Sequence, residues 1–127
     1  SATIDVPAEL VDGAIVRVSI DGWIPGQSVG VVQCADPDAY PEGQVPREDS
    51  GLPSPLFCDL QGFSRWDSGA DGSLEIEHTV VGAPMAERTD AGVTCDPDHP
   101  CVLNVFTADE GRFDPENPRV VFRLVVS

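Results

Sequence analysis

Apolar and polar side chains alternate one by one in several short stretches, and this pattern constrains the fold more than any other feature of the chain. Val16, Val18 and Ile20 alternate with Arg17 and Ser19. The same period of two recurs in residues 74–80 and 120–126. It places alternate side chains on opposite faces of a β-strand, whereas a helix would repeat about every 3.6 residues. The alternation therefore predicts half-buried strands and no helix.

Turn-forming residues separate these stretches at short intervals. Asp21-Gly22, Pro25-Gly26 and Asp71-Gly72 each follow or precede an alternating segment. Short strands with turn signals every 8–12 residues are typical of a β-sandwich. At 127 residues the chain fits one domain, residues 1–127, with about seven strands. The expected strands cover residues 3–6, 15–20, 29–34, 58–66, 74–80, 101–107 and 120–126.

The cysteines favour two disulfides. There are four of them, Cys34, Cys58, Cys95 and Cys101. An even number in a small acidic domain favours disulfides and a secreted protein, although the three ways to pair them stay open. Pairing sequence neighbours closes the shortest loops, and the turn-forming residues 96–100 would bring the second pair together. Zinc bound with His99 is the alternative, but the spacings do not match those of structural zinc sites.

The charge balance is strongly acidic and excludes some partners. The chain carries 22 Asp and Glu against seven Arg and no Lys, a formal net charge of −15. This field repels phosphate, so neither direct nucleic-acid binding nor binding to an anionic membrane surface is expected. No apolar run reaches the ~20 residues of a membrane-spanning helix. The start at Ser1 fits a mature secreted protein as well as a cytosolic one, and we expect a monomer.

Residues 35–57 differ in character from the rest of the chain, and we call them the cysteine loop. They contain five prolines and many acids, which predicts a long irregular loop. Such loops inside compact domains are often functional. The acids could gather a cation, but the composition favours a role in keeping a Pro-rich loop solvated. They include Asp36, Asp38, Glu42, Glu48 and Asp49.

No set of residues points to catalysis. His78 lies on the apolar face of its expected strand, which predicts a core-edge histidine with one hydrogen-bond partner, and His99 lies in a polar turn. The chain has no G-x-S-x-G motif. Residues 67–78 fail as a calcium loop, because Gly69 and His78 stand at ligand positions. Nothing selects a pair of acids for glycoside hydrolysis.

A series of short motifs follows a fixed order along most of the chain. They are Leu10–Gly13 before the strand 15–20, Gln33-Cys34, Cys58 with Phe63 five positions on, Asp71-Gly72, and Gly92–Cys95 before Cys101. None of them is specific alone, but their order resembles that of the neocarzinostatin family. These proteins are the apoproteins of enediyne antitumour chromoproteins.

The resemblance implies a fold and a function. In the family, a seven-stranded immunoglobulin-like sandwich stands beside a two-stranded ribbon, which here would be Gly82–Gly92. A cleft between them holds a labile apolar enediyne chromophore non-covalently. The protein is not an enzyme: it protects the chromophore and releases it, and the chromophore itself damages DNA. The resemblance also implies the disulfides Cys34–Cys58 and Cys95–Cys101.

The resemblance further implies a set of ligand-binding residues. Gln33, the Cys34–Cys58 bridge and Phe63 would form the cleft floor, where a ring and a bridge offer polarisable surface and an amide orients a polar group. Two further residues depart from the family. Met85, at the expected ribbon tip, stands in place of the family's aromatics and would contact the ligand as a soft lid edge. Phe106 falls where a family member has a small polar cleft residue, and would stack on the ligand or fill the cleft.

Two functions stay open, because the cysteine loop is much longer than in the family and the ribbon is shorter. The first is a carrier of a hydrophobic, reactive small molecule, which predicts an apolar cleft of roughly 300 Å³ or more. The second is a secreted immunoglobulin-like module that binds a protein or sugar through its loops, with no small-molecule ligand. A closed cleft filled by Phe106 and Phe57 would favour the second.

Overall fold

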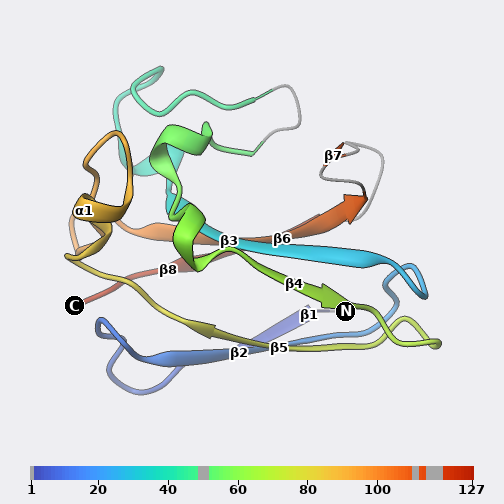
Figure 1. Cartoon of the computed structure of the whole chain (residues 1–127). Helices are drawn as coiled ribbons and strands as arrows, with labels where there is room; N and C mark the ends of the chain where they lie inside the picture. The colour runs from blue at the N-terminus through green and yellow to red at the C-terminus, as the bar shows by residue number, and fades with distance from the viewer. Residues whose placement is uncertain (1, 49–51, 110–111, 114–118) are drawn as a thin grey trace.

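Two antiparallel β-sheets pack face to face in the computed structural model, which describes residues 2–48, 52–109, 112–113 and 119–127. Figure 1 shows the two sheets edge-on, one above the other, with the short helical turns toward one end. The arrangement confirms the predicted all-β, immunoglobulin-like sandwich.

The smaller sheet has the order β1-β2-β5, from β1 (Ala2–Asp5), β2 (Ile15–Ile20) and β5 (Leu74–Thr79). Val18 pairs with Ile76 and Val16 with His78, so the buried positions of β2 and β5 share one face. This matches the predicted alternation: the exposed partners, such as Arg17 and Glu77, lie on the opposite face.

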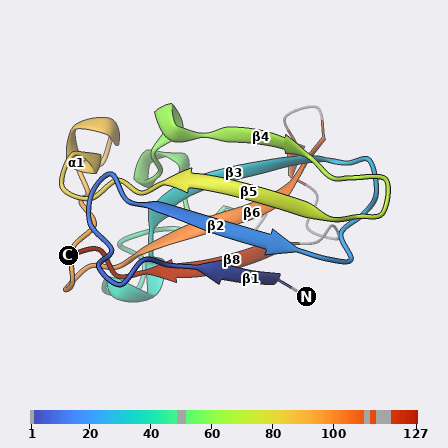
Figure 2. The ribbon, with the colours of Figure 1, turned by 90° about the horizontal axis from the view of Figure 1, so that it is seen from below.

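The larger sheet is built around β3 (Ser28–Ala35) and β6 (Cys101–Asp109). On one side β3 pairs with β4 (Ser64–Asp67), and β6 pairs with β8 (Arg119–Leu124) on the other. At its far end β6 also pairs with the short β7 (Arg112–Phe113). Figure 2 shows β5, β2 and β1 lying across these strands. β7 falls within the expected polar loop 108–118, whose remaining parts lie partly outside the described residues.

The main core lies between the sheets. Val16, Val18, Val31, Val105 and Leu103 are fully buried there. β3 is nearly buried along its whole length, which is typical of a strand covered on both faces. A second, smaller apolar cluster therefore lies on the outer face of the larger sheet.

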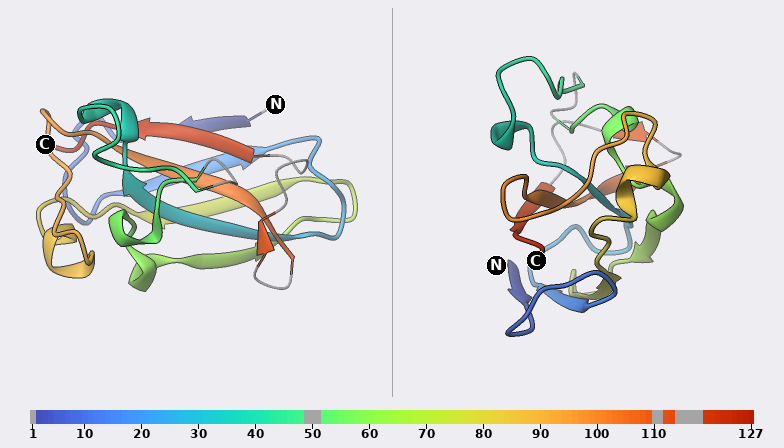
Figure 3. Two further views of the ribbon diagram at one scale, coloured as in Figure 1. Left: turned by 90° about the horizontal axis from the view of Figure 1, so that it is seen from above. Right: turned by 90° about the vertical axis from the view of Figure 1, so that its left-hand side faces the viewer.

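The connections that the structure describes contain four short helical turns: η1 (Pro37–Ala39), η2 (Pro55–Phe57), η3 (Leu60–Gly62) and α1 (Met85–Arg88). None of the helical segments in the described ranges is long enough to cross a membrane. Figure 3 shows that α1, the cysteine loop and the C-terminus gather around one end of the sandwich.

The prediction of a ribbon over Gly82–Gly92 is wrong, because this segment contains α1. The amide N–H groups of Met85, Ala86 and Glu87 donate to the carbonyl groups three residues earlier. Pro84 precedes the helix with φ −59°, a backbone angle that suits a helix start. These hydrogen bonds form a single helical turn where a second strand of a ribbon was expected.

Candidate functional site

The larger sheet carries the second apolar cluster on its outer face. Both disulfides are formed between sequence neighbours, as predicted, and Cys34–Cys58 lies within this cluster. On β3 and β6 every second side chain faces outward, and the register pairs Cys34 with Val102, Val32 with Asn104 and Gly30 with Phe106. The members of the cluster are Val32, Cys34, Cys58, Val102 and Phe106, with Leu52 and Phe63 packed against them.

Gly30 makes room for the two rings of this cluster. A Cβ atom at Gly30 would lie 2.8 Å from Phe106 Cζ and 3.1 Å from Phe63 Cζ. The ring centroids are 6.2 Å apart with an interplanar angle of 51°, within the range of favourable tilted pairs. Phe106 is 8% exposed, whereas Phe63 stays partly exposed with the Arg65 guanidinium 5.8 Å from its centroid.

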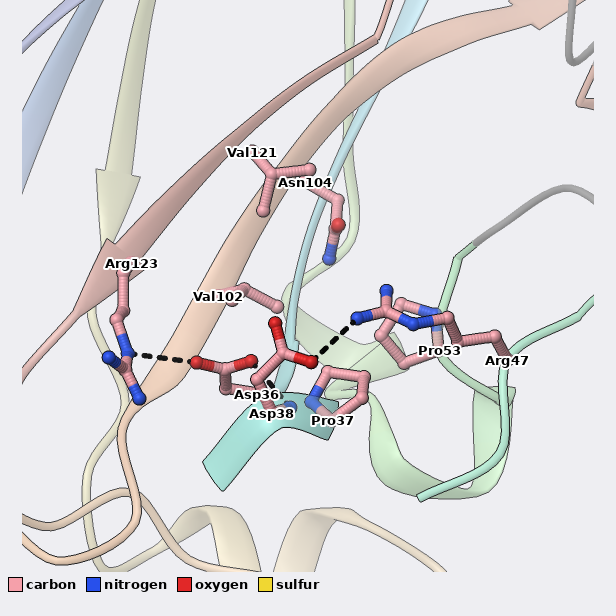
Figure 4. Close-up of a pocket in the computed structure, with 9 residues that line it drawn as sticks. All are labelled: Asp36, Pro37, Asp38, Arg47, Pro53, Val102, Asn104, Val121 and Arg123. Carbon is pink, nitrogen blue, oxygen red and sulfur yellow. Dashed lines mark hydrogen bonds and ion pairs between the residues drawn. The ribbon is translucent and has the colours of Figure 1, made fainter. Parts of the chain in front are cut away.

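A pocket of about 230 Å³ adjoins the cluster. Val102 and Asn104 of β6 and Val121 of β8 form its floor, and the cysteine loop forms its walls (Figure 4). Asn104 is 2% exposed and its Nδ2 lies 3.5 Å from the Val32 carbonyl oxygen. In Figure 4 the Asn104 amide points toward the space between Val102 and Arg47. The floor of the pocket is therefore apolar except for the Asn104 amide.

Two ion pairs form the polar walls of this pocket. Arg123 Nε lies 2.8 Å from Asp36 Oδ2, and the Asp36 side chain is only 7% exposed. Asp36 Oδ1 also accepts a hydrogen bond from Asp38 N, which caps η1. Arg47 Nη2 lies 3.4 Å from Asp38 Oδ1, and both of these side chains are largely exposed. Two acids face two guanidinium groups, so the walls carry no net charge.

Further contacts attach the cysteine loop to the sandwich around the pocket. Asp36 N donates to the Pro100 carbonyl, and the rings of Tyr40 and His99 lie 5.1 Å apart. Burial, with a smaller contribution from the nearby Asp96, raises the pKa of Tyr40. Within the loop, Ser54 N donates to the Pro46 carbonyl. The pocket wall is therefore a folded segment fixed at several points.

The structure brings together four of the six predicted ligand-binding residues: Cys34, Cys58, Phe63 and Phe106. They form the cluster beside the pocket, and none of them lines the pocket itself. The predicted positions of the other two are wrong. Gln33 is adjacent to Cys34 on β3 and so faces the sandwich interior, where it is fully buried. Met85 is also fully buried, because α1 turns its side chain into the core instead of exposing it at a ribbon tip.

Gln33 belongs to a buried polar network. Its Oε1 accepts from Val81 N at 3.1 Å, its Nε2 donates to the Val81 carbonyl, and His78 Nε2 lies 2.9 Å from Oε1. His78 is 5% exposed, as expected of a core-edge histidine with one partner. The pKa of His78 is lowered to about 4, chiefly by burial, with the Asp59 carboxylate opposing this shift and the Arg88 charge adding to it. His78 is therefore neutral at pH 7.

Sequence reasoning missed the residues that line the pocket, apart from the two acids of the cysteine loop. Asn104, Val121 and Arg123 look like ordinary strand residues, and only the register of β6 against β8 brings them together. Asp36 was expected to keep the loop solvated, but it is buried and paired with Arg123. In the described ranges, no three His, Cys, Asp or Glu side chains gather closely enough to hold a metal ion.

Comparison with known proteins identifies the family. The model of the neocarzinostatin family matches residues 3–117. The chain belongs to the neocarzinostatin family. The resemblance inferred from the order of the motifs is thereby confirmed. The family comprises the apoproteins of enediyne chromoproteins, which are ligand-binding carriers rather than enzymes.

A solved structure shares the fold of this family member over its full length. The structure of macromomycin has a TM-score of 0.62 and 22% sequence identity, and the match covers 100% of each chain. Among curated protein sequences there is no match.

Proposed function

We propose that this chain is a secreted apoprotein that binds, protects and delivers a labile, largely apolar small molecule of the enediyne kind. The ligand occupies the outer face of the larger sheet, with one group inserted in the pocket of Figure 4. The observation that carries the proposal is an apolar floor, Val102 and Val121, set between polar walls and next to the Phe63–Phe106 cluster. Family membership supports the same kind of function.

The physical chemistry of the pocket suits one part of such a ligand. Its volume of about 230 Å³ is smaller than the cleft expected for a polycyclic molecule, so the rest of the ligand extends over the partly exposed Phe63. Apolar area that leaves water contributes about 25 cal/mol per Å². The Asn104 amide and the two guanidinium groups would orient polar substituents.

Native mass spectrometry of the protein purified from the medium of its source organism tests this proposal. We expect a co-purifying small molecule in the wild type. Val121→Trp fills the pocket and should remove the molecule, whereas Val125→Trp, at an exposed position that does not line the pocket, should keep it. Ligand-free wild-type protein would contradict the proposal, and equal retention by both variants would place the ligand elsewhere.

One observation favours a second candidate function, recognition of a protein or sugar through the cysteine loop. Phe106 packs against Phe63 and closes the face beside the bridge. The loop also borders an open hollow of about 570 Å³, lined among others by Tyr40, Val45 and Arg47. This candidate predicts ligand-free protein in the same experiment. It also predicts amide shifts confined to residues 37–47 when the macromolecular fraction of the medium is added.

A further inference from the structure

Another hollow, of about 280 Å³, lies at the open edge of the sandwich between β4 and β5. Figures 1 and 2 show these two strands running side by side at this edge, with α1 beyond their ends. The hollow shares no lining residue with the pocket of Figure 4. Its polar lining includes Asp59, Ser64, His78, Thr79 and Arg88.

Asp59 presents an unpaired acceptor in this hollow. The residue is completely buried. Its Oδ1 accepts hydrogen bonds from Gly62 N at 3.2 Å and from Arg88 Nε at 3.0 Å. Its Oδ2 is buried and has no hydrogen-bond partner within the described part of the chain. A buried carboxylate oxygen without a donor is unfavourable, so this atom calls for a donor from outside the chain.

Gly62 packs closely against that oxygen. A Cβ atom at this position would lie 2.6 Å from Asp59 Oδ2 and 3.5 Å from Arg88 Nη2. The backbone of Gly62 is not in the left-handed region, so space is what a side chain would lack here. The carboxylate oxygen and a guanidinium nitrogen thus lie on the same side of Gly62 at the hollow, and one accepts hydrogen bonds while the other donates them.

His78 adds a second acceptor. The Val81 N–H donates to Gln33 Oε1, which identifies that atom as the amide oxygen. His78 Nε2 lies 2.9 Å from the same oxygen and must therefore carry the proton. The other ring nitrogen, Nδ1, is then the unprotonated acceptor of a neutral imidazole that lines the hollow.

The charged side chains of the hollow are each paired, so the ligand needs no net charge. Asp59 is paired with Arg88, and Glu77 at the rim is paired with the exposed Arg17. An ammonium group would meet the Arg88 charge and could only donate, whereas a carboxylate would meet Asp59 and could only accept. A hydroxyl group both donates and accepts.

We propose that this hollow binds a neutral polyhydroxyl small molecule of the monosaccharide class. One hydroxyl donates to Asp59 Oδ2 and accepts from the Arg88 guanidinium, and a second donates to His78 Nδ1. The site is separate from the proposed carrier function and stands whether or not the outer face binds an enediyne.

Titration with methyl β-D-glucopyranoside, followed by ¹H–¹⁵N NMR of the histidine side chains and backbone amides, tests the proposal. We expect a saturable shift of His78 Nδ1 and of the Gly62 amide with a Kd on the order of 1–10 mM, an affinity typical of few hydrogen bonds. His99, in the exposed turn, serves as the internal control and should not shift. Methylammonium chloride at equal ionic strength should produce no such shift.

Two variants separate the site from general effects on the fold. Gly62→Ala displaces the Asp59 carboxylate and should weaken binding at least tenfold, whereas Gly69→Ala, in the distant 67–73 turn, should not change it. Arg88→Lys keeps the charge but loses the planar fork, and should weaken binding several-fold. An absent saturable shift, which would mean an ordered water only, overturns the proposal. So does a stronger shift with methylammonium, or unchanged binding in folded Gly62→Ala and Arg88→Lys.

Discussion

At the scale of single residues, Gly30 controls how the rings pack on the outer face. The Gly30→Ala change would place a methyl group 2.8 Å from the Phe106 ring. We expect overpacking to lower the free energy of unfolding by about 1–3 kcal/mol. Urea denaturation measures this, with Gly69→Ala as the control because its Cβ would meet only the exposed Asp71 carboxylate and neighbouring Ser73. An equal loss in both variants would show that the ring contact is not the cause.

His78 makes stability depend on pH. Its pKa of about 4 in the folded protein lies below the ordinary value of 6.5. The unfolded state therefore binds more protons between these values, and the free energy of unfolding falls as the pH drops from about 6.5 to about 4. The loss attributable to His78 is at most about 3 kcal/mol. This loss should be absent from His78→Gln, so it should appear as the difference between wild type and this variant when both are denatured at several pH values.

At the scale of structural elements, the two arginines of the pocket should differ in their contribution to stability. Arg123→Gln leaves the buried Asp36 carboxylate without its cation, and we expect a loss of about 1–3 kcal/mol together with loosening of η1. Arg47→Gln breaks an exposed pair with Asp38, and we expect at most about 0.5 kcal/mol. Thermal denaturation and hydrogen exchange of residues 36–40 measure both effects. A larger effect for Arg47 would mean that the exposed pair anchors the loop.

The elements also show what sequence patterns can and cannot predict. The period of two in β2 and β5 depends only on neighbouring residues, so it was readable in advance. The same rule places Gln33 and Cys34 on opposite faces of β3. The family resemblance instead predicted that both contribute to the cleft floor. The helix α1 was missed because four residues are too few to show a helical period. The pocket was missed because it depends on the register of β8 against β6 and on where the loop folds back.

At the scale of the whole molecule, the charge of −15 determines which partners can approach. The ligand-free protein should not bind duplex DNA, because both carry strong negative fields and acids outnumber the seven arginines by 15. A gel-shift assay at about 0.15 M salt should show no complex, which makes any DNA damage by a loaded form the work of a released ligand. A shift by ligand-free protein, reduced by added salt, would contradict this expectation.

The Cys34–Cys58 bridge has a consequence for how such a scaffold diversifies. The two Cα atoms are 4.0 Å apart, so the cysteine loop leaves the sheet and returns to nearly the same point. The cost of closing a loop grows only with the logarithm of its length. Insertions between the two cysteines can therefore accumulate while the strands and the inner core stay unchanged. The outer face can thus carry loops of different length and sequence, so new binding specificities can evolve or be grafted there without redesign of the sandwich.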